Sequence, residues 1–286
     1  MKLYKLAQGV ILNHELTSYL FNEDWDTLVN KEKLYSYLLS LITELPRITQ
    51  EKALEEITKN LLPPIGNQEV WAAGVTYLRS REARMEESAG SGAADLYDKV
   101  YAAERPELFF KSMPHRVAGH NQEVFIRRDS TWNVPEPELA LFINSSGTIQ
   151  GYTIGNDMSS RSIEGENALY LPQAKIFERS AALGPCLYVP EDTIPGDTPI
   201  KMSIHRNGQQ MYNDETNIGR MKRTLPELAG YLYRECEFQN GCYLMTGTCL
   251  VPPNDFTLHP GDVVSISIDP VGQLVNFVNY KPEIIS

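Results

Sequence analysis

The stretch Val134-Pro-Glu-Pro-Glu-Leu139, followed by Gly151-Tyr-Thr-Ile-Gly-Asn-Asp157, decides how the fold of this chain is interpreted. Alternate residues of an extended segment point to one face, so Glu136 and Glu138 can present their oxygens to one point. Asp157, after the next expected strand, can close a pocket of three oxygens. Oxygen-only ligation suits a hard divalent cation, Mg²⁺ with Mn²⁺ or Ca²⁺ as alternatives, rather than zinc. The pattern therefore predicts a divalent-metal site.

The same two glutamates have a second interpretation, because alternating polar residues are typical of the solvated face of a strand. Two alternating glutamates followed by a distant aspartate are a weak motif when taken alone. Three carboxylates packed together without a cation, however, repel one another and resist ionisation. A bound metal is therefore the economical hypothesis for such a cluster.

The composition is that of a globular protein with a substantial core. The chain has 286 residues, 42% hydrophobic and 22% charged, enough for one large domain or a small one plus a larger one. The net charge is −11 without any Lys/Arg cluster, so we expect no nucleic-acid partner. No apolar run approaches the ~20 residues of a membrane-spanning helix, and no signal peptide is evident. The four cysteines lack metal-ligand spacing and indicate reduced thiols in a cytoplasmic protein.

Residues 1–65 differ from the rest and are predicted to form a small N-terminal α/β domain. Apolar residues recur at helical spacing from Leu34 to Leu45, and Pro46 is expected to stop that helix. A second helix is expected from about Gln50 to Leu62. Residues 66–286 then form the larger domain, which carries the expected metal site.

Beyond residue 66 the pattern changes to mostly strands with few helices, which indicates a rolled or barrel-like mixed-β core. Asn144-Ser-Ser-Gly147 is favourable turn chemistry, so its flanking strands are expected to form a hairpin. Thr224-Leu-Pro-Glu227 is a capping box that begins a helix through about Arg234. Residues 79–104 are interpreted either as two exposed helices or as a lid over substrate. The expected strands are Glu69–Val75, Glu123–Arg127, Glu138–Ile143, Thr148–Ile154, Ala182–Val189, Ile200–Arg206, Tyr243–Met245 and Val263–Ile268.

Several motifs in fixed order resemble the fumarylacetoacetate hydrolase superfamily, over residues 66 to about 280. The resemblance implies an α+β fold, a mixed β-sandwich roll like the C-terminal part of fumarylacetoacetase, in a homodimer or higher homo-oligomer. It also implies that Glu136, Glu138 and Asp157 bind Mg²⁺ or another divalent cation, and that Lys175 is the family lysine. The motifs are Glu107-Leu-Phe-Phe-Lys111, Glu136-Pro-Glu138, Gly151-Tyr-Thr-Ile-Gly-Asn-Asp-Met-Ser-Ser-Arg161, Lys175, Leu183-Gly-Pro185 and Thr246-Gly-Thr248.

One departure from the family pattern narrows the expected activity. Hydrolases of the family carry a water-activating histidine in a Gly-x-Asn-Tyr-x-x-His motif, whereas this chain reads Gly74-Val-Thr-Tyr-Leu-Arg-Ser80. A serine does not act as a general base near neutral pH without help, which disfavours hydrolysis of a carbon–carbon bond. Other motifs resemble the branch of 2-keto-3-deoxy sugar-acid dehydratases, which includes the 2-dehydro-3-deoxy-D-arabinonate dehydratases. They are Trp71-Ala-Ala-Gly-Val-Thr-Tyr77, Arg79-Ser-Arg-Glu82, Tyr97-Asp-Lys-Val-Tyr101, Arg105-Pro-Glu-Leu-Phe-Phe-Lys111 and Glu164-Gly-Glu-Asn-Ala-Leu-Tyr-Leu-Pro-Gln-Ala-Lys175.

That branch implies a hydro-lyase of pentose catabolism that converts 2-dehydro-3-deoxypentonate, a small 2-keto acid, into 2,5-dioxopentanoate. A divalent cation that chelates the keto acid makes it easier to enolise, and loss of the C4 hydroxyl then completes a β-elimination. The protein must add a base near C3 and an acid near the C4 oxygen.

Lys175 is the expected base, because a neighbouring cation favours the neutral amine; its alternative role is a charge partner for the substrate carboxylate. The acid is expected to be Glu107, Glu82 or a metal-bound water, and the sequence does not choose among them. The alternative for Thr248 is a plain strand turn, and for Arg79 an exposed helical position. The predicted substrate contacts are Thr248, Lys111 and Arg79.

Other activities stay open at this point. An acylpyruvate-type hydrolase or a decarboxylase would use the same scaffold, and the missing histidine argues against only the hydrolase. A metal-dependent ligand-binding protein without turnover is the third possibility. The intact set of three carboxylates and Lys175 argues against it, since a decayed site is expected to lose some members.

Overall fold

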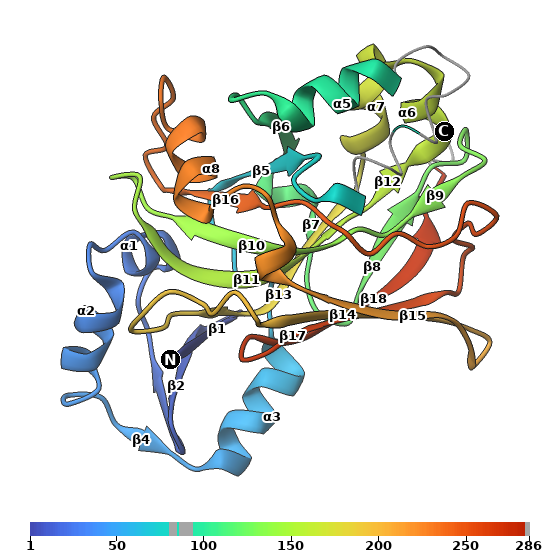
Figure 1. Ribbon diagram of the computed structural model, residues 1–286. Coiled ribbons are helices and arrows are strands. Elements are labelled where there is room, and N and C mark those ends of the chain that lie inside the picture. Colours follow the sequence, from blue (N-terminus) through green and yellow to red (C-terminus); the bar gives the residue numbers. More distant parts are fainter. Residues whose placement is uncertain (80–84, 86–93, 284–286) are drawn as a thin grey trace.

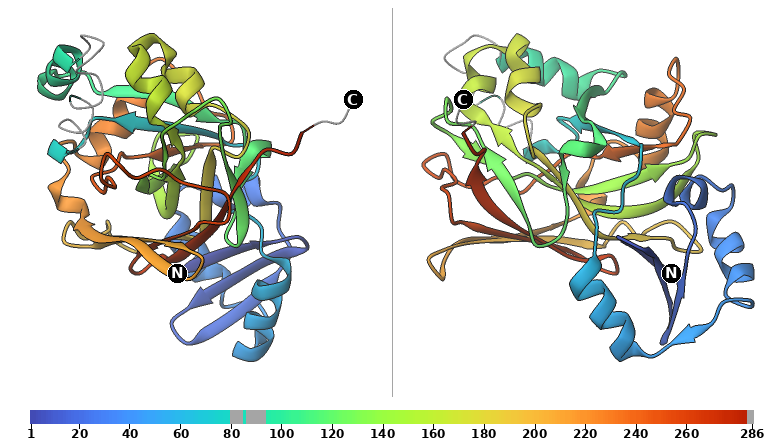
Figure 2. Two further views of the ribbon diagram at one scale, coloured as in Figure 1. Left: turned by 90° about the vertical axis from the view of Figure 1, so that its right-hand side faces the viewer. Right: turned by 180° about the vertical axis from the view of Figure 1, so that it is seen from behind.

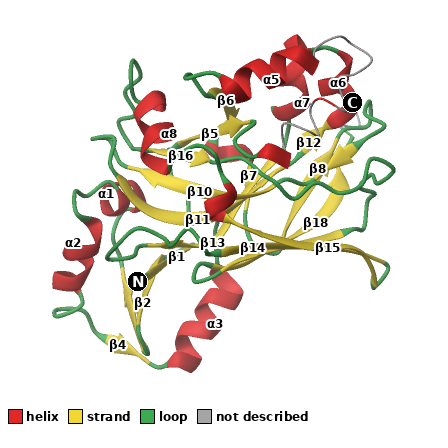
Figure 3. Cartoon of the chain, in the orientation of Figure 1, coloured by secondary structure: helices red, strands yellow, loops and turns green. Residues whose placement is uncertain are grey.

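The computed structural model describes residues 1–79, 85 and 94–283. The chain forms an 11-stranded sheet and a five-stranded sheet, together with a short two-stranded one. The two larger sheets pack against each other in the middle of the molecule, and the helices lie around their edges (Figures 1 and 3).

The 11-stranded sheet runs from the N-terminal strands to the strands that carry the acidic motif. β1 pairs antiparallel with β13, with Leu3 opposite Leu187, so the first residues continue the sheet of the larger part. In spatial order its strands are β4 (Arg47–Ile48), β3 (Thr17–Phe21), β2 (Gly9–His14), β1 (Lys2–Leu6), β13 (Ala181–Tyr188), β11 (Ile149–Asp157), β10 (Pro137–Ile143), β16 (Cys242–Met245), β5 (Glu69–Gly74) and β6 (Glu107–Ser112), with β7 (Val117–Ala118) beside β13.

The five-stranded sheet covers one face of the larger one. Its order is β15 (Gln209–Asn217), β14 (Pro199–Arg206), β17 (Val263–Ile268), β18 (Gly272–Tyr280) and β8 (Gln122–Ile126), and the two-stranded sheet joins β12 (Ser159–Ser160) to β9 (Asn133–Val134).

The expected strands all occur, and the predicted hairpin is confirmed by the antiparallel pairing of β10 with β11. β11 extends three residues beyond the predicted end at Ile154, to Asp157 itself. β15 was not expected, because its residues are mostly exposed and polar and show no alternation of apolar side chains. β14 nevertheless holds it in place through antiparallel pairing along its length.

β10 lies at the centre of the core, and all seven of its residues are buried. Alternate residues of a strand face opposite sides of a sheet. Leu139 and Leu141 therefore pack in the cluster between the two sheets, which also includes Met202 of β14. Ala140 and Phe142 face the other side and join a separate cluster. A strand covered on both faces reads as a continuous apolar run, as β10 does after Glu138.

The N-terminal segment packs three helices against its strands: α1 (Trp25–Val29), α2 (Leu34–Leu41) and α3 (Gln50–Asn60). The two predicted helices are confirmed, but α2 ends at Leu41 rather than next to Pro46. The reason is a change of hydrogen bonding, since the amides of Thr43 and Glu44 bond to carbonyls three residues back. The boundary predicted at residue 65 stays a prediction.

The remaining helices gather mainly at the end of the molecule opposite α3 (Figures 1 and 2). The predicted capping box of Thr224 and Glu227 is confirmed at the start of α8, which ends at Leu232. Of the segment 79–104, the structure describes Arg79, residue 85 and α5 onward, so the lid hypothesis, Ser80 and Glu82 lie outside the described residues. In the described part, no helix has the length and apolar character needed to cross a membrane. The helices are α5 (Ala94–Ala102), α6 (Arg161–Glu166), α7 (Leu171–Lys175) and α8 (Leu225–Leu232), with short 3-10 turns η1 (Pro114–Arg116), η2 (Ala168–Tyr170) and η3 (Ile218–Arg220).

The four cysteines are free thiols in different environments, and their reactivity is predicted to follow burial. Cys186 and Cys242 are buried, Cys249 is partly buried and Cys236 is exposed. Burial raises the pKa of Cys186 to about 12, so at neutral pH it stays a thiol, which is a poor nucleophile. We expect iodoacetamide to label Cys236 first in the native protein and Cys186 only after unfolding, as read by peptide mass spectrometry. Labelling of Cys186 at the rate of Cys236 would contradict this.

Candidate metal and catalytic site

Glu136, Glu138 and Asp157 lie together at the ends of β10 and β11. The backbone N–H of Asp157 donates to the carbonyl of Glu136 at 2.9 Å, which places the two residues side by side across the hairpin. One oxygen from each of the three carboxylates lies within 4.8 Å of the other two, and all three residues are buried. The structure therefore brings together the side chains that the alternating pattern predicted to converge.

One oxygen of each carboxylate is held by a donor of its own. Arg161 Nη2 donates to Glu136 Oε1 at 2.5 Å, and Lys111 Nζ forms an ion pair with Asp157 Oδ1 at 2.5 Å. The backbone N–H of Gly247 donates to Glu138 Oε2 at 2.6 Å. We call these three oxygens the outer oxygens, and the second oxygen of each carboxylate the inner oxygen.

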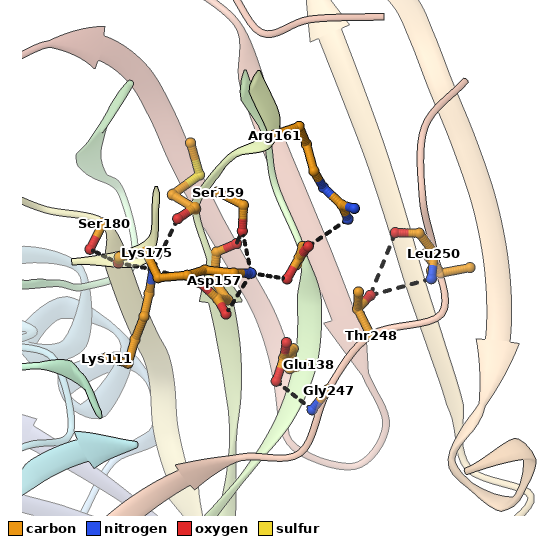
Figure 4. A network of polar contacts seen from close by, with 12 residues as sticks. Lys111, Glu138, Asp157, Ser159, Arg161, Lys175, Ser180, Gly247, Thr248 and Leu250 are labelled. Carbon is orange, nitrogen blue, oxygen red and sulfur yellow. Dashed lines mark hydrogen bonds and ion pairs between the residues drawn. The ribbon is translucent and has the colours of Figure 1, made fainter. Parts of the chain in front are cut away.

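The Lys175 ammonium lies between two of the inner oxygens. Its Nζ donates to Glu136 Oε2 at 2.6 Å and to Asp157 Oδ2 at 3.3 Å, and a third bond of 2.6 Å goes to Ser159 Oγ. Figure 4 shows the lysine reaching past Asp157 into this network. Lys175 is the last residue of α7, and Ser180 Oγ donates to its carbonyl at 2.9 Å, which fixes the point where the helix ends.

The three carboxylates do not share one electrostatic environment. Burial raises the pKa of Glu138, and the negative charges of Asp157 and Glu136 raise it further. Burial acts in the same direction on Asp157, but the nearby Lys111 and Lys175 outweigh it and leave the pKa of that carboxyl below its usual value. Among the described residues, Glu138 forms no ion pair and accepts its hydrogen bond from the Gly247 N–H, so it is the carboxyl with most to gain from an added positive charge.

Lys111, a predicted substrate contact, points inside the protein. It is fully buried in β6, and besides Asp157 its ammonium donates to the carbonyls of Met158 at 2.9 Å and Lys175 at 2.5 Å. An ammonium has three N–H groups, so these contacts occupy it. Its predicted contact with substrate stays a prediction, whereas its contacts with Asp157 and Lys175 fix two members of the site.

Thr248 and Arg79, two of the other predicted residues, line different cavities. Thr248 lines the same small cavity as the carboxylates. Arg79 lines another cavity of about 620 Å³, together with Tyr77, Asp214 and others. Glu82 lies outside the described residues.

Glu107 lies against the wall of the carboxylate cavity. It is opposite Gly74 in the β5–β6 pair, and Gly74 lines that cavity. A Cβ atom added at Gly74 would come within 2.0 Å of Glu107 Oε2, so only glycine permits this approach. Among the described residues, this buried oxygen has no hydrogen-bond partner. Glu107 therefore lies next to the carboxylate cavity with one oxygen that is not tied to the described residues by a hydrogen bond.

Three residues of the site were not predicted from the sequence: Ser159, Arg161 and Gly247. Ser159 and Arg161 lie within four positions of Asp157, inside the motif from Gly151 to Arg161. Their closeness to Asp157 in the sequence could have indicated that they belong to the site. Gly247 has a φ of +94°, a left-handed backbone that favours glycine, and this conformation gives its N–H to Glu138.

The donor set fits a hard divalent cation. Carboxylate oxygens are the ligands that Mg²⁺ and Ca²⁺ prefer, and three of them converge here from rigid strand ends. The cavity lined by these residues measures about 10 Å³, which is room for one ion or water molecule.

Comparison with known proteins agrees with this geometry. The family described as fumarylacetoacetate (FAA) hydrolase C-terminal matches residues 70–279. The chain belongs to the fumarylacetoacetate hydrolase family. Its mixed, sheet-dominated fold is that of the family's solved structures, as the resemblance in sequence implied.

Two of the relatives that the chain matches over most of its length are named as dehydratases. The chain is 45% identical to the probable 2-keto-3-deoxyxylonate dehydratase of Haloferax volcanii, over 78% of this chain and 76% of that protein. It is 41% identical to the 2-dehydro-3-deoxy-D-arabinonate dehydratase of Saccharolobus solfataricus, over 80% of this chain and 76% of that protein. A solved 2-keto-3-deoxy-D-arabinonate dehydratase complexed with magnesium and 2,5-dioxopentanoate is 32% identical, with a TM-score of 0.86 over 99% of this chain and 100% of the other.

Removing one partner of the buried ion pair of Lys111 is predicted to destabilise the protein strongly. In a Lys111→Met variant, the buried charge of Asp157 loses the nearer of its two lysine partners and keeps only Lys175 at 3.3 Å, so the free energy of unfolding should fall by about 3 kcal/mol. The matched control is Lys201→Met, which removes an exposed ion pair with Glu215 of 3.4 Å and should cost at most about 1 kcal/mol. Urea denaturation measures both. Equal losses in the two variants would contradict the prediction.

Proposed function

We propose that this chain is a divalent-metal-dependent hydro-lyase that converts a 2-dehydro-3-deoxypentonate into 2,5-dioxopentanoate. The observation that carries the proposal is the buried cluster of Glu136, Glu138 and Asp157, in a chain 41% and 45% identical to named dehydratases of such acids. The likeness in fold to the enzyme solved with magnesium and 2,5-dioxopentanoate supports the same conclusion.

We propose Mg²⁺ as the cation, with Mn²⁺ or Ca²⁺ as alternatives, held by the three carboxylates. When bound, the cation would supply the positive charge that lowers the barrier to enolising a 2-keto acid. The protein's own contribution is to hold the carboxylates ready, through Arg161, Lys111 and the N–H of Gly247. Preorganised ligands need little rearrangement when a cation and a substrate arrive.

The reaction needs one proton removed from C3 and one delivered to the C4 hydroxyl. We assign the first role to Lys175, and keep a charge contact with the substrate carboxylate as its alternative. We assign the second to Glu107, whose buried Oε2 lies beside the cavity wall, with Glu82 or a metal-bound water as alternative acids. The C3–H electron pair forms the new double bond, the C4 oxygen leaves as water, and later proton transfers place an aldehyde at C5. Thr248 would contact the substrate carboxylate from the cavity lining, while Lys111 and Arg79 stay predicted contacts.

We further propose, from family resemblance alone, that the enzyme is a homodimer or higher homo-oligomer in the cytoplasm. The proposed reaction does not depend on either property, since all described members of the cluster come from one chain.

The central test is turnover with purified protein, Mg²⁺ and 2-dehydro-3-deoxypentonate, with the product detected by coupling to a semialdehyde dehydrogenase. We expect product with Mg²⁺ and none after treatment with EDTA. A Glu138→Gln variant should lose at least about 100-fold in activity, because it removes one charged ligand while keeping the shape. Acylpyruvate cleavage without dehydration would favour the hydrolase, and tight binding without turnover would favour the ligand-binding protein.

A Gly74→Ala variant tests whether Glu107 is the catalytic acid. The added methyl group must displace the Glu107 carboxylate, so dehydration should slow by about 100-fold, the usual scale for a misplaced catalytic group. Exchange of the substrate C3 protons with deuterated water, followed by NMR, should persist because it needs the base and the cation but not the acid. The control is Gly230→Ala, since a Cβ atom at that exposed helical position meets nothing within 4 Å. Full dehydration by Gly74→Ala would remove Glu107 as the acid.

A further inference from the structure

The outer and inner oxygens of the carboxylates have different partners. The three outer oxygens are bound by Arg161, Lys111 and the Gly247 N–H, which hold each carboxylate from outside the cluster. The inner oxygens of Glu136 and Asp157 instead share one partner, Lys175 Nζ, at 2.6 and 3.3 Å. A metal ion bound at this point would likewise be shared by these two carboxylates.

We propose that the Lys175 ammonium is a resident cation of the metal-free enzyme, which competes with the divalent cation for the inner oxygens of Glu136 and Asp157. Cation binding then requires Nζ to give up these two contacts. The inference rests on the proposed function, because it concerns the same cluster, and it adds a second task for Lys175.

Charge explains why a resident cation is needed. Carboxylates this close and fully buried repel each other, and burial without a partner disfavours their charged forms. Lys175 offsets the repulsion between Glu136 and Asp157 while no metal is bound. The cluster can then keep its geometry in the empty state and does not have to assemble around the incoming ion.

The surroundings of Lys175 can retain the ammonium after it leaves the inner oxygens. Ser159 Oγ already accepts a bond of 2.6 Å, and the ring of Phe109, another residue lining the cavity, lies with its centroid 5.6 Å from Nζ. An aromatic face attracts an ammonium at this range. A displaced Nζ therefore stays in the cavity, where a keto acid would meet it. Metal binding would in this way turn Lys175 from the carboxylates toward the substrate.

The test compares Mg²⁺ affinity, without substrate, in the wild type, Lys175→Met and Lys111→Met, by isothermal titration calorimetry. Both variants replace a lysine by methionine and so remove one positive charge from the cluster. Only Lys175→Met, however, removes the cation that is bound to the inner oxygens. We expect Lys175→Met to bind Mg²⁺ at least about tenfold more tightly than Lys111→Met, because in Lys111→Met the Lys175 ammonium still has to be displaced from the inner oxygens. Equal affinity in the two variants, or weaker binding by Lys175→Met, overturns the inference.

Thermal unfolding provides a second readout if either variant is unstable. We expect Lys175→Met in EDTA to melt at a lower temperature than the wild type, and Mg²⁺ to raise its melting temperature by more than it raises that of the wild type. A shift no larger than that of the wild type overturns the inference. Failure of the proposed function is distinguishable, because the wild type itself would then show neither Mg²⁺ binding nor dehydration.

Discussion

Three carboxylates buried within 4.8 Å of one another set a charge requirement that the surrounding elements have to meet. Each cation that meets it comes from a different element: Lys111 from β6, Arg161 from the start of α6 and Lys175 from the end of α7. A buried charge without a partner is strongly destabilising. The approach of these elements to the ends of β10 and β11 is therefore required by the electrostatics as well as by apolar packing.

The protein's own cations bear on whether the cluster needs a metal. From the sequence, repulsion among three acidic groups favoured a bound cation, but the structure shows that protein cations already relieve much of that repulsion. The more specific indication is the division of the oxygens. Donors from outside fix one oxygen of each group, and the second oxygens of Glu136 and Asp157 share the Lys175 ammonium as a partner.

Local patterns in the sequence predicted local features well. Period-two alternation placed Glu136 and Glu138 on one face, turn chemistry gave the β10–β11 hairpin, and a capping box began α8. The partners of the cluster depend on contacts between distant segments, which these patterns do not encode. Lys111 was noted as a motif residue, but its pairing with Asp157 follows from where β6 lies in the sheet. β15 escaped prediction because pairing with β14, rather than an apolar face, holds it.

The position of β10 has a consequence for the first part of the chain. Ala140 and Phe142 alternate in step with Glu138, and they pack in one cluster with Leu3 and Leu28 of the N-terminal segment. β1 to β4 thus continue the sheet that carries the acidic residues, and Leu28 of α1 packs in the cluster on one of its faces. A fragment beginning at residue 66 would lose these contacts and uncover apolar side chains around Ala140 and Phe142, and an exposed apolar surface tends to associate with other chains. Packing by the N-terminal segment therefore reaches Ala140, two residues along β10 from Glu138.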